Sequence, residues 1–176
     1  MSDFLEQLDD LATDLRTHFE YINSGGCAVV AVMMYEKLKP ILGRKVQIEY
    51  RMAGLGVTDD VKKDSIKRSV RVWKENSETL TNISLYGAAG FSCCHAYILF
   101  TYEGERYMFD TDYGVITRQQ AKRVLQQDYA RGVGVRVAFP IVKQMAESVE
   151  GWNSVFDRRQ IEPMRQRIES TVLVAE

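Results

Sequence analysis

The sequence has few residues that cross-link or break a chain: three cysteines, three prolines and two histidines among 176 residues. An odd number of cysteines, with Cys93 and Cys94 adjacent, makes a poor disulfide framework and indicates a reducing compartment. The absence of a CxxC pair argues against a zinc ribbon. A metal site built from Cys27, Cys93 and His95 would lack a fourth ligand, so we expect no metal and no cofactor.

Charge and hydropathy argue against a protein that binds nucleic acid or an anionic membrane, and against one that spans a membrane. The net charge of −1 gives no global field toward nucleic acid or an anionic membrane, and the basic stripe on a predicted helix over residues 59–80 is most simply a solvated face. No run approaches the ~20 apolar residues of a membrane-spanning helix. The start, MSDFLEQLDD, carries acids where a signal peptide needs a basic region. We therefore expect a cytoplasmic protein, with signal-less export left open.

A single domain over residues 1–176 is the simplest organisation, because no repeat or Pro-rich linker interrupts the chain. Apolar spacing predicts helices over 3–19, from Cys27 to an end marked by Pro40 and Gly43, over 59–80, from about 117, and in a C-terminal part from about 140. Alternation predicts strands over 45–52, 92–102, 105–111 and 133–138. Glu103-Gly104 is a hairpin turn signal between two of them. This order predicts an α+β fold with a small antiparallel sheet.

Cys27 has the surroundings of a nucleophile. It follows Gly25-Gly26 in a predicted loop and opens a helix that is apolar nearly all round. A cysteine reacts as the thiolate, which a helix N-terminus and a neighbouring histidine favour. Glycine lets the backbone turn sharply and approach a substrate. The first amides of the helix would lack internal partners and could face a developing oxyanion.

A base and an orienting acid are expected on the predicted hairpin. His18 lies within the first helix, whereas His95 opens a strand. If Tyr102 faces Glu105, His95 lies opposite Asp112, with Asp110 one diagonal step away. Alternation puts both acids on the face of His95, so either can hold the imidazole.

Each of these residues also has a structural interpretation. Buried cysteines are commonly inert, a histidine can be a satisfied core residue, and aspartates near a strand end can start a turn. The combination in the order Cys27, His95 and aspartate favours catalysis over three separate structural roles.

The segment HAYILFTYEGERYMFD, residues 95–110, resembles the histidine and aspartate strands of transglutaminase-like proteins, in which an Asp follows the His by fifteen positions. It is also similar to arylamine N-acetyltransferases, which carry a Gly-Gly-x-Cys loop. The resemblance implies a papain-like/transglutaminase-like fold with a nucleophile helix packed on a small antiparallel sheet and additional helices. It also implies that Asp110, rather than Asp112, completes the triad.

The chain departs from these families at three places. Tyr97 replaces their Trp, Ser24 stands where the acetyltransferases have Arg, and the papain-like glutamine before the nucleophile is missing. Beside Gly26 in the nucleophile loop, Asn23 and Tyr21 are the candidates for the second oxyanion donor.

We expect a cysteine hydrolase that acts on a peptide, isopeptide or glutamine side-chain amide through a Cys27 acyl-enzyme. The alternative is an acyltransferase using a small acyl donor, and a non-enzymatic interaction module ranks third. The expected partner is a protein or peptide substrate or a small acyl donor. Oligomeric state stays open.

Overall fold

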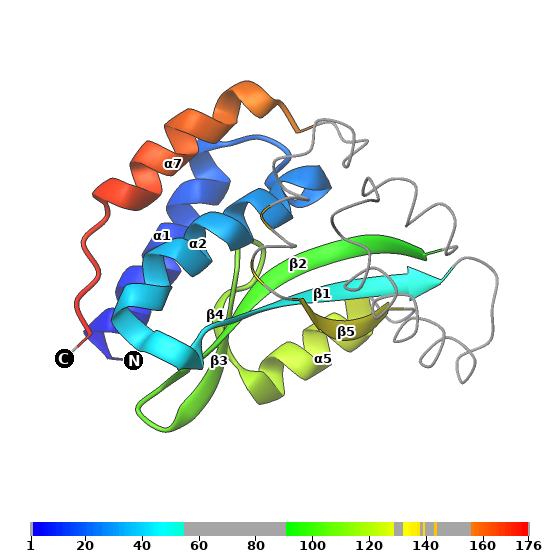
Figure 1. Ribbon diagram of the computed structural model, residues 1–176, viewed down its shortest axis with the longest axis horizontal. Helices are drawn as coiled ribbons and strands as arrows, with labels where there is room; N and C mark the ends of the chain where they lie inside the picture. The colour runs from blue at the N-terminus through cyan, green and yellow to red at the C-terminus, as the bar shows by residue number, and fades with distance from the viewer. Residues whose placement is uncertain are drawn as a thin grey trace.

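A five-stranded antiparallel sheet, in the order β4-β3-β2-β1-β5, lies at the centre of the fold (Figure 1). The computed structural model describes residues 2–54, 91–128, 132–137, 139, 143 and 156–175. The strands are β1 Gln47–Gly54, β2 Phe91–Tyr102, β3 Glu105–Asp110, β4 Gly114–Thr117 and β5 Gly132–Val137. With four α-helices in the described residues, this confirms the α+β class. The predicted helix over 59–80 and its basic stripe lie outside the described residues.

The β2–β3 hairpin has the predicted register. Tyr102 pairs with Glu105, and the turn residues Glu103 and Gly104 have φ values of 49° and 80°. Two positive φ values are typical of a type I′ turn, whose twist suits a two-residue hairpin.

A β-bulge interrupts the pairing of β1 with β2 beside the candidate histidine. Arg51 pairs with His95, but the next residue, Met52, pairs with Cys93. Cys94 is therefore the extra residue on β2, directly before His95. A bulge changes the direction of neighbouring side chains. The alternation assumed from the sequence is therefore interrupted at Cys94, between Cys93 and His95.

The two faces of the sheet are covered by different helices (Figure 1). Helices α1 (Asp3–His18) and α2 (Cys27–Leu42) pack on one face, where α2 is buried continuously from Cys27 to Met34. Helix α5 (Arg118–Asp128) packs on the other. A capping box joins Thr117 and Gln120 at its start: Thr117 N–H donates to Gln120 Oε1 at 2.9 Å, and Gln120 N–H donates to Thr117 Oγ1 at 3.3 Å.

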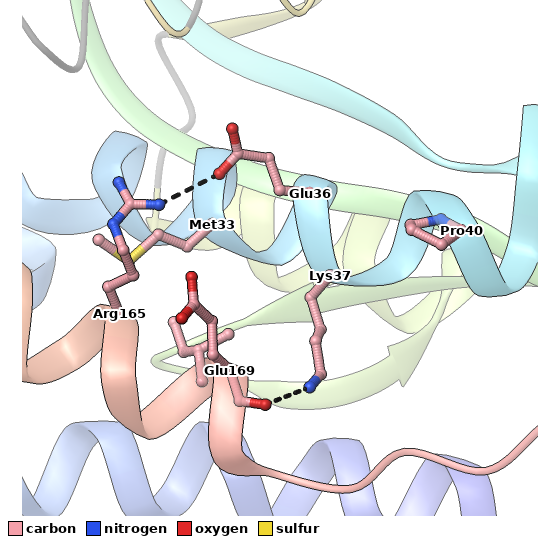
Figure 2. A pocket seen from close by; sticks show the side chains of 7 residues that line it. Met33, Glu36, Lys37, Pro40, Arg165 and Glu169 are labelled. Carbon is pink, nitrogen blue, oxygen red and sulfur yellow. Dashed lines mark hydrogen bonds and ion pairs between the residues drawn. The ribbon is translucent and has the colours of Figure 1, made fainter.

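Helix α7 (Ile161–Ser170) packs along α2 (Figure 2). Arg165 pairs with Glu36 at 3.3 Å, and Lys37 Nζ donates to the Glu169 carbonyl at 2.9 Å. A hollow of about 250 Å³ lies between the two helices. Because these two pairs join the helices across the hollow, we interpret it as a gap in the packing of α2 against α7.

The second helix ends at Leu42, between the two residues expected to mark its end, Pro40 and Gly43, and Gly43 provides the stop with φ +62°. Strand β4 was not predicted; it directly follows the turn that begins at Thr111. The C-terminal helix α7 ends at Ser170, so Val172 lies beyond it and is 74% exposed. No helix among the described residues is long and apolar enough to cross a membrane.

Candidate active site

The structure brings Cys27, His95 and Asp110 together from three elements. Cys27 is the first residue of α2, His95 lies on β2, and Asp110 ends β3. The His95 Nε2 atom donates a hydrogen bond to Asp110 Oδ2, and Cys27 lies near enough to the same ring to influence its pKa. The three residues are only 4%, 0% and 2% exposed.

The electrostatics of this group keep His95 protonated. Burial is the largest single influence and lowers the pKa of His95. The hydrogen bond to Asp110, followed by the influence of nearby Cys27 and the charge of Asp110, outweighs burial and raises that pKa to about 10. His95 is therefore an imidazolium at neutral pH, held between an acid and a sulfur.

Between the two candidate acids, only Asp110 hydrogen-bonds the histidine. Its other oxygen, Oδ1, accepts the backbone N–H of Asp112 at 2.7 Å, which fixes the carboxylate. The Asp112 side chain is exposed and accepts a hydrogen bond from Asn23 Nδ2 at 2.5 Å. Burial of the group and the Asp110 charge raise the pKa of Asp112.

The prediction of an open loop before Cys27 is wrong. Ile22–Gly26 forms a single π-helical turn, η1, that runs directly into α2, and Gly25 adopts φ +119° within it. A π-helical turn joins an N–H to the carbonyl five residues earlier. The turn therefore satisfies amides that an open loop would leave free just before the helix.

Gly26 makes room for an aromatic ring. A Cβ built on Gly26 would lie 2.7 Å from a ring carbon of Phe156, a buried residue just before α7. The need for glycine thus comes from tight packing beside the nucleophile.

The two candidate oxyanion donors lie in different settings. The Tyr21 side chain is 58% exposed, and its backbone is left-handed with φ 58°. The Asn23 amide bridges to the turn after β3: its Oδ1 accepts from the Thr111 hydroxyl at 2.6 Å, and its Nδ2 donates to Asp112. Asn23 is thus engaged with the acid-bearing turn.

Helix α1 supplies two supports that the sequence analysis missed. Arg16 donates to the carbonyls of Thr111 and Asp112 at 2.9 and 2.7 Å. Asp9 Oδ1 accepts the backbone N–H of Val115 at 2.8 Å. Both residues flank the apolar stripe of α1, which is the one sequence signal that they lie near the sheet.

A buried carboxylate lies beyond the histidine. Glu49 on β1 is 5% exposed and accepts hydrogen bonds from Tyr97 Oη at 2.6 Å and Arg118 Nη2 at 3.3 Å. The rings of Tyr97 and His95 lie 5.8 Å apart. Burial, followed by the charge and hydrogen bond of Glu49, raises the pKa of Tyr97. The sequence held one signal for this site: Glu49 is a charged residue inside a predicted strand, between Ile48 and Tyr50.

Among the described residues, no group of three His, Cys, Asp or Glu side chains is placed to hold a metal ion. The side chains of Cys93 and Cys94 lie outside the described part of the chain. In comparisons with protein-family models, curated proteins and solved structures, nothing matches this chain.

Proposed function

We propose that the protein is a cysteine-dependent hydrolase that forms an acyl-enzyme on Cys27. The observation that carries this proposal is the buried His95 ring, which hydrogen-bonds Asp110 and lies near enough to Cys27 for that residue to raise its pKa. A histidine fixed by a carboxylate and facing a thiol at a helix start is the arrangement that activates a cysteine nucleophile.

In the acylation step, the Cys27 sulfur attacks the carbonyl carbon of an amide, and a carbon–sulfur bond forms. The His95 imidazolium donates its proton to the leaving nitrogen as the carbon–nitrogen bond breaks. Asp110 stays ionised and stabilises the imidazolium, so that its charge is balanced before the reaction.

In the second step, neutral His95 takes a proton from water. The water oxygen bonds to the acyl carbon, the carbon–sulfur bond breaks, and the thiolate–imidazolium pair is restored. If an amine replaces water, the same intermediate gives acyl transfer, the alternative function. Incorporation of a labelled amine into the product distinguishes transfer from hydrolysis.

The arrangement of elements supports a papain-like/transglutaminase-like interpretation of the α+β fold. A nucleophile at the start of a buried helix packs against an antiparallel sheet, and a hairpin of that sheet carries the histidine and aspartate fifteen residues apart. The support is this topology together with the sequence resemblance.

The test is the pH dependence of Cys27 alkylation by iodoacetamide, a small reagent chosen because Cys27 is 4% exposed. Peptide mapping by mass spectrometry separates Cys27 from Cys93 and Cys94. We expect labelling to persist at about pH 6, where an unassisted thiol is almost fully protonated. The His95→Ala variant should lose this reactivity while still reacting in alkali.

The matched control is His18→Ala, because His18 is the only other histidine and lies on α1 with a side chain 47% exposed. This variant should keep the wild-type profile. A wild-type protein that reacts only in alkali, with a profile indifferent to the loss of His95, would overturn the proposal.

A further inference from the structure

The nucleophile and its base lie on elements far apart in the sequence. Cys27 belongs to α2, whereas His95 and Asp110 belong to the β2–β3 hairpin. Misplacement of reacting groups by about 1 Å can cost about a hundredfold in rate. Contacts that hold the Cys27 turn against the hairpin are therefore expected to affect reactivity without touching a substrate.

Asn23 makes such a contact. It lies in η1, four positions before Cys27, and both ends of its amide reach the turn that follows Asp110. Its Oδ1 accepts from the Thr111 hydroxyl at 2.6 Å, and its Nδ2 donates to Asp112 Oδ1 at 2.5 Å.

The far end of this bridge is itself fixed. Thr111 is 4% exposed, and Arg16 of α1 holds its carbonyl at 2.9 Å. The next backbone N–H, that of Asp112, donates to Asp110 Oδ1 at 2.7 Å. The turn that receives Asn23 therefore also sets the position of the carboxylate that holds His95.

From this geometry we propose that Asn23, through Thr111, is a positioning residue that keeps Cys27 in register with His95 and Asp110. This inference rests on the proposed function. It replaces the oxyanion role considered for Asn23, because the polar atoms of its amide are engaged with the acid-bearing turn. Loss of the bridge weakens the contact between sulfur and imidazole while the catalytic residues stay intact.

The experiment compares Cys27 alkylation rates at about pH 6 and about pH 9, taken as a ratio for each variant. At the higher pH the thiolate forms without help, so a variant that merely loosens or blocks the site changes both rates. Loss of positioning lowers the rate at the lower pH alone. We expect Asn23→Ala and Thr111→Val to lower the ratio by about tenfold or more.

Two variants test the hydroxyl itself. Thr111→Ser keeps the hydroxyl and should keep the wild-type ratio, which a role for the Thr111 methyl group in packing would not predict. Thr101→Val makes the same threonine-to-valine change on β2, away from the bridge, and should leave the ratio unchanged. The double variant Asn23→Ala, Thr111→Val should lose no more than the more affected single variant, because both remove one bridge.

The outcomes separate this inference from the proposed function. If His95→Ala does not change the wild-type ratio, the proposed function fails and the inference fails with it. If reactivity at low pH needs His95 but survives Asn23→Ala and Thr111→Val in folded protein, the inference alone is overturned. If Asn23→Ala does not fold, the comparison of Thr111→Val with Thr111→Ser decides it: equal ratios refute the bridge.

Discussion

The Asp110→Asn substitution tests the electrostatics of the site most fully, because it removes one charge and keeps an oxygen that can accept from His95. The structure gives His95 a pKa of about 10, against an ordinary value of 6.5, and the hydrogen bond to Asp110 is the strongest of the influences that raise it. A hydrogen bond to a charged group contributes about 1.5–3 kcal/mol. At about 1.4 kcal/mol per pKa unit, the substitution should lower the pKa of His95 by about one to two units.

The shift has a consequence for stability. The folded-state pKa of His95 lies above its unfolded value, so its contribution to the free energy of unfolding is fully present below pH 6.5 and is lost as pH rises toward 10. The substitution should therefore destabilise the protein by about 1.5–3 kcal/mol at neutral pH. This difference from wild type should shrink between about pH 8 and pH 10, where the protonated form disappears in both proteins.

The assay is an NMR titration of the histidine Cε1–H signals, with His18→Ala to assign the two resonances, together with urea unfolding at several pH values. The difference between wild type and Asp110→Asn isolates the charge pair, because every other group is the same in the two proteins. A wild-type His95 that titrates near 6.5 would refute this reasoning, and so would a titration that the substitution leaves unchanged.

Three further substitutions test the packing around the site. Gly26→Ala should cost about 1–3 kcal/mol in urea unfolding because its Cβ meets the Phe156 ring, and adding Phe156→Leu should recover part of the loss; no recovery would contradict the contact. Tyr97→Phe should cost about 1–3 kcal/mol, because the buried Glu49 carboxylate loses a donor; a neutral result would mean that the hydroxyl is not needed. Gly114→Ala should lower the melting temperature more than either, because φ is +70° and the new Cβ would clash with Oδ1 of Asp9 on α1; an unchanged melting temperature would refute that geometry.

Local patterns predicted much of the described fold. The apolar stripe of α1, the start of α2 at Cys27 and the turn at Glu103-Gly104 depend on residues near in sequence, and the structure has all three. The capping box of Thr117 and Gln120 was likewise visible from two residues three positions apart.

The sequence did not show features that depend on distant contacts. The bulge at Cys94 arises from the pairing of β2 with β1, a strand more than 35 positions earlier in the sequence (Gly54 pairs with Phe91), so alternation along β2 alone could not reveal it. The π-helical turn before Cys27 also escaped prediction, because Asn23-Ser24-Gly25-Gly26 has the composition of a loop. Its geometry is tied to contacts with Phe156 and Thr111 from elsewhere in the chain.

The choice between the two acids shows the same limit. Strand register alone placed Asp112 opposite His95, and only the fifteen-residue spacing of the resembling families favoured Asp110. Strand β3 ends at Asp110, and the backbone turns there, so Asp112 is directed to Asn23 instead of the imidazole.

The central claim is that Cys27 carries an acyl group that His95 helps to form and remove. Its most direct test is to mix the protein with p-nitrophenyl acetate, quench at short and long times, and map the acetylated residue by mass spectrometry. We expect an acetyl group on Cys27 that forms and then disappears in wild type, and that forms slowly and persists in His95→Ala. Acetylation confined to other residues, or a Cys27 adduct whose formation and loss are the same without His95, would contradict it.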